Sequence, residues 1–233
     1  MKWKNPLFES PLDFGDISNR SEKEKLAEAV SSKVKDGDVI GVGSGSTAML
    51  AIKAIGEKVN REKLQVKAVP TSKEAAFTCT YYGIPVSSLT EVKPDWGFDG
   101  ADEVDSDKRL IKGRGGAMFM EKLVIASSPK TYILVDQSKF VTRLGEKAEV
   151  PIEVDPRAIH LVEEQLIEHC EPAYVHLRKA AAKDGPVITE AGNVILDVRL
   201  PDIPHTMEKQ LKSFPGVVET GLFIGYSVEI LYL

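Results

Sequence analysis

The stretch Asp38-Val-Ile-Gly-Val-Gly-Ser-Gly-Ser-Thr47 decides the fold class of this chain. Its first half is a short apolar run that is typical of a buried strand. Its second half is a turn rich in glycine and serine, and a helical pattern follows from about Ala48 to Lys58. A strand that passes through a glycine loop into a helix indicates an α/β protein with a parallel sheet.

The alternation of strands and helices continues on both sides of this stretch. Ser21 and Glu24 have the spacing of a capping box, which predicts a helix ahead of the first strand. Strands alternating with helices predict a mostly parallel sheet with helices on both faces. Further strands are predicted at Gln65 to Val69, Trp96 to Phe98 and Thr131 to Val135, and helices at Lys73 to Tyr82 and Gly116 to Ser128.

The pattern changes after residue 144. A β-α-β-β-α-β order from Ala148 to Phe223, with a single last strand at Val217 to Phe223, predicts an inserted ferredoxin-like α+β unit. Val228 to Leu233 is apolar enough to return as a strand to the first sheet. We therefore expect a catalytic α/β domain at 1–144 and 224–233 and a smaller, lid-like α+β domain at 145–223.

Composition limits the classes of partner. The 233 residues are 42% hydrophobic and carry a net charge of −5, and no basic run with interleaved aromatic residues occurs, so nucleic acid is not an expected partner. Cys79 and Cys170 lack metal-ligand spacing and are expected to be reduced thiols. No apolar run approaches the ~20 residues needed to span a bilayer, and the irregular first 20 residues lack a signal-peptide core. These features predict a cytoplasmic protein that does not bind membranes.

The loop at Gly41 to Thr47 is a candidate phosphate site. Backbone N–H groups and the dipole at a helix N-terminus favour an anion, and the alternative is a tight turn capped by Ser46. NAD is not expected, because the glycine spacing is Gly-x-Gly-x-Gly and no acid ends the second strand. Lys139 follows another strand end and either neutralises the same phosphate or is a surface lysine. The candidate phosphate ligands in the loop are Ser44, Gly45, Ser46 and Thr47.

Two carboxylates three positions apart follow a third predicted strand. Asp99 and Asp102 flank Gly100 and Ala101, and on a loop such a pair holds sugar hydroxyls or exchanges a proton with one. A Mg²⁺ or Ca²⁺ site and an acidic surface turn are the alternatives. Lys112 argues against a metal because an ammonium group already supplies positive charge.

The next segment offers a cation and a base. Lys112-Gly113-Arg114-Gly115 brings charge and backbone donors toward an oxygen-rich substrate, unless it is only a flexible loop. Glu121 follows on a predicted helix where a desolvated carboxylate would have a raised pKa, as a general base requires. The alternative is a Glu121/Lys122 pair at the surface. The residues one turn away from Glu121 are Ala117, Met118, Val124 and Ile125, all apolar.

Taken together, these motifs resemble the ribose-5-phosphate isomerase type A family. The resemblance covers roughly Ser21 to Phe223. Ser44 stands where threonine is common in the family and Arg114 where glycine is common, which leaves open whether Arg114 faces the site. The motifs are Gly-Val-Gly-Ser-Gly-Ser-Thr at 41–47, Phe-Asp-Gly-Ala-Asp-Glu-Val-Asp at 98–105, Lys-Gly-Arg-Gly-Gly-Ala at 112–117, Glu-Lys at 121–122, Asp-Gln-Ser-Lys at 136–139 and Phe-Pro-Gly-Val-Val at 214–218.

The resemblance implies interconversion of ribose 5-phosphate and ribulose 5-phosphate through an enediol, in the non-oxidative pentose phosphate pathway, without metal or cofactor. It implies that Glu121 moves a proton between C2 and C1, that Asp99 acts in ring opening, that Asp102 binds a hydroxyl and that Lys112 steadies an oxyanion. Ser44 to Thr47, Lys139 and Lys23 would bind the phosphate.

Two other classes of protein share this general fold. A sugar-sensing regulatory domain would bind a phosphosugar without turnover, and a coenzyme A transferase would use a glutamate as nucleophile. The apolar strands of the small domain suggest self-association, and we expect a homodimer or homotetramer.

Overall fold

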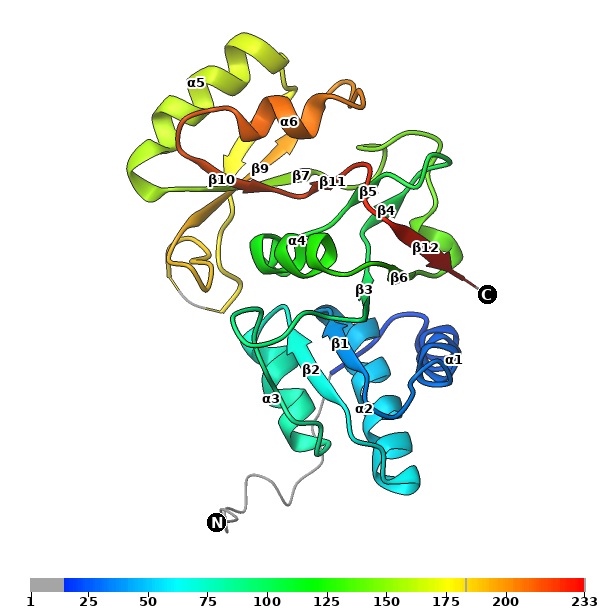
Figure 1. The fold of residues 1–233 in the computed structure, drawn as a ribbon. Coiled ribbons are helices and arrows are strands. Elements are labelled where there is room, and N and C mark those ends of the chain that lie inside the picture. The colour runs from blue at the N-terminus through cyan, green and yellow to red at the C-terminus, as the bar shows by residue number, and fades with distance from the viewer. Residues whose placement is uncertain (1–14, 183, 233) are drawn as a thin grey trace.

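The computed structural model describes residues 15–182 and 184–232, and its central sheet is five-stranded in the order β12-β6-β3-β1-β2 (Figure 1). Every pair of neighbouring strands in this sheet is parallel. The expected parallel sheet and the return of the C-terminal strand to it are both confirmed. The strands are β1 (Val39–Val42), β2 (Lys67–Pro70), β3 (Trp96–Gly100), β6 (Thr131–Leu134) and β12 (Val228–Leu231).

Helices cover both faces of the central sheet because alternate strand residues point to opposite sides. Ile40 and Val42 of β1 belong to the hydrophobic core that the first three helices form. Gly41, between them, faces the opposite side and lies against Val124 of α4. The helices are α1 (Arg20–Ser31), α2 (Gly45–Glu62), α3 (Lys73–Tyr81) and α4 (Met118–Ser127).

Three predicted helix starts differ from the structure, and the first is that of α4, which begins at Met118 rather than Gly116. Helix α2 begins at Gly45 rather than Ala48, so part of the glycine loop is the first helical turn. The capping box of Ser21 and Glu24 does not form, since the N-cap residue of α1 is Asn19 and makes no side-chain cap hydrogen bond. Glu24 instead pairs with Arg20 one turn away, at 2.9 Å.

The second sheet is antiparallel and four-stranded, in the order β10-β7-β9-β8. With its β-α-β-β-α-β chain order, this is the ferredoxin-like arrangement that the sequence predicts. Figure 1 shows α5 and α6 on one face of it, while α4 lies between the two sheets and contacts β1, β3 and β10. The elements are β7 (Val150–Val154), α5 (Ile159–Cys170), β8 (Tyr174–Leu177), β9 (Val194–Arg199), α6 (Met207–Lys212) and β10 (Val217–Thr220), with 3₁₀ turns at Gln137–Lys139 and Pro156–Ala158.

A third, small sheet joins the other two. Its strands are β4 (Glu103–Val104), β5 (Leu110–Ile111) and β11 (Leu222–Phe223), in the order β11-β5-β4. The prediction of one strand from Val217 to Phe223 is wrong, because the chain changes sheets at Gly221. A Cβ atom at Gly221 would lie 2.3 Å from the carbonyl oxygen of Lys112, so only glycine permits this close approach.

The predicted division into domains, with 145–223 as a lid, remains a proposal. Among the described residues, no helix combines the length and apolar character that a membrane crossing requires. Most of the irregular N-terminal arm, residues 1–14, lies outside the described residues.

Candidate active site

A cavity of about 530 Å³ opens at the carboxyl edge of the central sheet. It lies where the strand order reverses between β1 and β3, the usual ligand position in an open α/β sheet. Nearly all residues predicted for the site line it, although they come from four separate loops and α4. The predicted residues in its lining are Ser44, Gly45, Ser46, Thr47, Gly100, Ala101, Asp102, Lys112, Gly113, Arg114, Gly115, Glu121 and Lys139.

Asp99 lies directly behind this lining. Its Oδ1 accepts hydrogen bonds from the backbone N–H groups of Ser44, at 3.2 Å, and Gly100, at 2.8 Å. A Cβ atom at Gly43 would lie 2.2 Å from Oδ1, so a residue with a side chain there would displace the carboxylate. Burial raises the pKa of Asp99, although the charge of Lys112 opposes the shift. Asp99 thus couples the glycine loop after β1 to the end of β3.

Lys112 is the central cation of the site and is 3% exposed. Its Nζ donates a hydrogen bond to the carbonyl oxygen of Gly100 at 2.7 Å and lies 3.0 Å from Oδ2 of Asp99. Burial disfavours the charge, but the carboxylates of Asp99 and Glu121 outweigh this effect and raise the pKa of Lys112. The ammonium is therefore fixed in position and stays charged.

Glu121 lies in the first turn of α4 and is 6% exposed. Its Oε2 is 3.3 Å from Nζ of Lys112, an ion-pair distance, but has no hydrogen-bond partner of acceptable geometry. Burial raises the pKa of Glu121 to about 8, with Lys112 opposing the shift and Asp99 adding to it. A carboxylate of this basicity at a cavity wall is suited to general-base chemistry. The alternative of a Glu121/Lys122 surface pair is wrong, since both side chains are buried.

The other end of the cavity is formed by the start of α2. Ser44 is the N-cap residue, so the alternative of a turn capped by Ser46 is wrong. The Ser44 hydroxyl does not bond to the helix, because it lies 2.7 Å from Thr71 Oγ1 and 2.8 Å from Ser72 Oγ. The first N–H groups of α2 consequently remain available for an anion.

Lys23, on α1, adds a cation at this end. It is 7% exposed, and its Nζ lies 3.4 Å from Ser46 Oγ. Burial lowers its pKa; the carboxylate of Asp136 opposes this, while the charges of Lys139 and Arg114 lower the pKa further. Within the parts of the chain that the structure describes, Lys23 has no carboxylate at ion-pair distance. Lys23, Lys139 and Arg114 are therefore three neighbouring cations, and such an arrangement favours a doubly charged anion such as a phosphate group.

The structure also answers the open question about Arg114, which lines the cavity. Its backbone N–H donates to Asp102 Oδ2 at 3.3 Å. Five lining residues were not predicted, because they belong to the irregular segment before α1 or to the apolar run at the end of β6. They are Asp16, Ile17, Ser18, Leu134 and Val135, whereas Asp136 lines the cavity from the 136–139 motif that the sequence shows.

One trio of side chains among the described residues could hold a metal ion. The ligand atoms of Glu149, His176 and Asp197 lie within 4.8 Å of one another. These residues are outside the cavity lining, and both oxygens of Asp197 already accept from the guanidinium of Arg178. The trio therefore offers a metal only a weakened ligand set. Glu149 and Asp197 line a second cavity of about 670 Å³, which shares Asp102, Arg114 and Lys139 with the candidate site.

Comparison with known proteins supports the same family. The family model of ribose 5-phosphate isomerase A (phosphoriboisomerase A) matches residues 67–232. Ribose-5-phosphate isomerase A of Methanothermobacter thermautotrophicus is 43% identical over 211 residues, which are 90% of this chain and 92% of that protein. The chain belongs to this family.

Solved structures of this family superpose on nearly the whole of this chain. Ribose 5-phosphate isomerase A from Methanocaldococcus jannaschii superposes with a TM-score of 0.89 at 41% identity, covering 92% of this chain and 95% of that one. A D-ribose-5-phosphate isomerase in complex with phospho-erythronic acid superposes with a TM-score of 0.87 at 39% identity, covering 93% of this chain and 96% of that one. The family and the α/β fold class predicted from the motifs are both confirmed.

Proposed function

We propose that this protein interconverts ribose 5-phosphate and ribulose 5-phosphate, an aldose–ketose isomerisation of the non-oxidative pentose phosphate pathway. The observation that carries the proposal is Glu121, a buried carboxylate with a raised pKa, beside the fixed ammonium of Lys112. The reaction needs one base that reaches two adjacent carbons and a cation that balances a developing oxyanion. Both groups lie at one wall of a cavity large enough for a pentose phosphate.

The phosphate group of the substrate binds at the opposite end. The first turn of α2 supplies backbone donors at Gly45, Ser46 and Thr47, and Lys23 and Lys139 supply charge. Arg114 adds a further cation from the glycine loop. Anchoring the phosphate there directs C1 and C2 of the open-chain sugar toward Glu121.

The isomerisation then proceeds by proton transfer through an enediolate. The carboxylate of Glu121 removes the proton from C2 of the aldose, and the C2–H electron pair forms the C1–C2 double bond while the carbonyl bond electrons move onto O1. The ammonium of Lys112 stabilises the negative charge on the enediolate oxygen. A proton passes from O2 to O1, and protonated Glu121 returns its proton to C1 to give the ketose.

Asp99 and Asp102 act on the hydroxyl groups. Asp99, held by Lys112 and two backbone N–H groups, exchanges the proton that ring opening requires. Asp102 binds a sugar hydroxyl from the cavity wall. The absence of a metal requirement, the cytoplasmic location and the assembly into a homodimer or homotetramer remain predictions from the sequence.

The direct test is turnover. Purified protein is mixed with ribose 5-phosphate, and ribulose 5-phosphate is measured by its ketose absorbance or by NMR. We expect conversion to an equilibrium mixture and exchange of solvent deuterium into C1 of the product. Phosphosugar binding without conversion contradicts the proposal and favours a sugar-sensing domain. Activity that appears only with a coenzyme A ester favours a transferase.

A further inference from the structure

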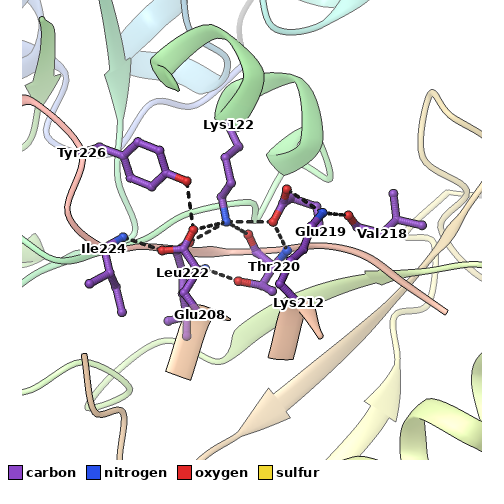
Figure 2. A network of polar contacts seen from close by, with 9 residues as sticks. All are labelled: Lys122, Glu208, Lys212, Val218, Glu219, Thr220, Leu222, Ile224 and Tyr226. Carbon is purple, nitrogen blue, oxygen red and sulfur yellow. Dashed lines mark hydrogen bonds and ion pairs between the residues drawn. The ribbon is translucent and has the colours of Figure 1, made fainter. Parts of the chain in front are cut away.

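Lys122 follows Glu121 on α4 but faces a different set of partners (Figure 2). Its Nζ lies 2.8 Å from Glu208 Oε1 and 2.9 Å from Glu219 Oε1. It also donates to the carbonyl oxygens of Thr220, at 2.9 Å, and Leu222, at 2.7 Å. With 6% exposure, Lys122 is a buried ammonium surrounded by four oxygen acceptors.

Glu208 and Glu219 are themselves held by further groups. Glu208 accepts from the hydroxyl of Tyr226 at 3.0 Å and from the backbone N–H of Ile224 at 2.7 Å. Lys212 lies 2.9 Å from the second oxygen of Glu219. Burial raises the pKa of Glu219, but the charge of Lys122 and the hydrogen bonds from Lys122, Lys212 and the backbone N–H of Thr220 outweigh it, so the pKa of Glu219 is lowered. Figure 2 shows the whole network gathered around the end of the Lys122 side chain.

The segment that Lys122 holds, residues 219–223, also holds Lys112. The backbone N–H of Lys112 donates to the carbonyl oxygen of Gly221 at 2.9 Å. The ring of Phe223 lies 5.5 Å from Nζ of Lys112 and 4.7 Å from Nζ of Lys122. One short segment therefore contacts the central cation of the site and the residue next to its base.

A buried ammonium is a costly way to pack two elements together. Replacing a buried ion pair with apolar residues of similar volume is often neutral or stabilising, so packing alone does not call for a charge here. An ammonium that binds four acceptors in four different directions does fix one position of α4 relative to residues 219–223.

We propose that Lys122 is a positioning residue for the isomerase reaction. Its ammonium holds residues 219–223 against α4 and thereby sets the distance between Lys112 and Glu121. This inference rests on the proposed function, since it assigns those two residues to the chemistry. Lys122 itself lines no part of the 530 Å³ cavity and does not touch substrate.

The test compares three variants with the wild-type protein. Lys122→Met keeps the length and apolar stem of the side chain and removes the charge. We expect kcat to fall on the order of 10–100-fold, because small misplacements of reacting groups have effects of this size. No residue of the network lines the cavity, so we expect KM to change less than threefold. A loss of packing alone lowers the amount of folded protein and does not separate kcat from KM in this way.

Lys212→Met is the matched control. Lys212 binds Glu219 in the same network but, among the described residues, forms no hydrogen bond or ion pair with α4 or Lys112, and its side chain is 43% exposed. We expect its kcat and KM to stay within twofold of the wild-type values. Active-site titration with phospho-erythronic acid corrects each kcat for the fraction of folded protein.

Glu208→Gln keeps the inference testable if Lys122→Met does not fold. It retains the shape of the side chain and weakens one acceptor of Lys122, and we expect a 3–10-fold fall in kcat with KM unchanged. A wild-type kcat per folded site in Lys122→Met, or in Glu208→Gln when the first variant does not fold, overturns the inference. The proposed function fails separately, if the wild-type protein does not isomerise ribose 5-phosphate.

Discussion

The ammonium nitrogen of Lys112 lies 3.3 Å from Oε2 of Glu121, and neither side chain is more than 6% exposed. The pair is close enough for the cation to affect the base, yet the oxygen makes no well-formed hydrogen bond. When Glu121 takes a proton its charge disappears, and the charge of Lys112 is then less compensated. The cation becomes more effective at the moment when the substrate oxygen acquires negative charge.

Glu121→Gln removes the proton acceptor and keeps the shape of the side chain. We expect kcat to fall on the order of 10²–10⁴-fold, the usual contribution of general-base catalysis. The dissociation constant of ribose 5-phosphate should stay within tenfold, because the phosphate site is intact. Steady-state kinetics and calorimetric titration measure the two quantities. Near-normal turnover removes Glu121 from the role of base.

The activity of the wild-type protein should depend on pH through the raised pKa of Glu121. Burial favours the neutral carboxyl and places its pKa at about 8 rather than 4.5. Only the ionised form accepts a proton, so kcat/KM should fall with a limiting slope of tenfold per pH unit below that pKa. A profile that stays flat down to pH 5 contradicts a raised pKa for the base.

The same pKa shift predicts an effect on stability. A carboxyl whose pKa is raised on folding contributes stability that is fully present below its unfolded pKa and is lost as pH rises through the folded pKa. For Glu121 this window runs from 4.5 to about 8. The amide side chain in Glu121→Gln does not titrate, so the melting temperature of this variant relative to wild type should increase between pH 5 and pH 8. Thermal unfolding across this range measures the difference, and a constant difference contradicts the prediction.

Lys112→Met should affect both the rate and its pH dependence. The loss of an oxyanion-stabilising cation lowers kcat on the order of 10²–10³-fold. Lys112 also lowers the pKa of Glu121, so its removal should move the acid limb of the pH profile to higher pH. Lys139→Met is the comparison, because loss of a phosphate ligand should raise KM and leave the acid limb in place. An acid limb that moves to lower pH in Lys112→Met contradicts the assigned charge effect.

Chelators should leave the reaction unchanged. Lys112 supplies the positive charge beside Asp99, where the sequence alone left a Mg²⁺ or Ca²⁺ site open. Activity after dialysis against EDTA is compared with activity after addition of each metal. Loss of activity in EDTA and its return with Mg²⁺ would restore the metal interpretation.

The sequence predicted the central sheet well, because strands that alternate with helices leave a strong local pattern. It also brought the loops of the site together, since carboxyl ends of parallel strands share one edge. It missed the sheet of β4, β5 and β11, whose two-residue strands are too short to show alternation. It also missed the change of sheets at Gly221, which depends on a close approach to Lys112 from far along the chain.

The sequence predicted which residues form the site, but it did not predict how these residues are placed relative to one another. Glu121 was suspected from its apolar neighbours on the helix, whereas the position of Asp99 behind the cavity wall could not be inferred from spacing. The buried network of Lys122 had no signal either. Its acceptors at 208 and 219–222 are about ninety to a hundred positions away, and no local pattern connects residues at that separation.

The pairing of β12 with β6 has a consequence for synthesis on the ribosome. Val228 pairs with Thr131, so one edge of the central sheet stays open until the residues of β12 have been translated and have left the exit tunnel. A nascent chain that ends after β11 exposes the backbone groups of β6, which invite pairing with another chain. Closure of the central sheet is therefore a long-range step, because β12 lies far along the chain from β6.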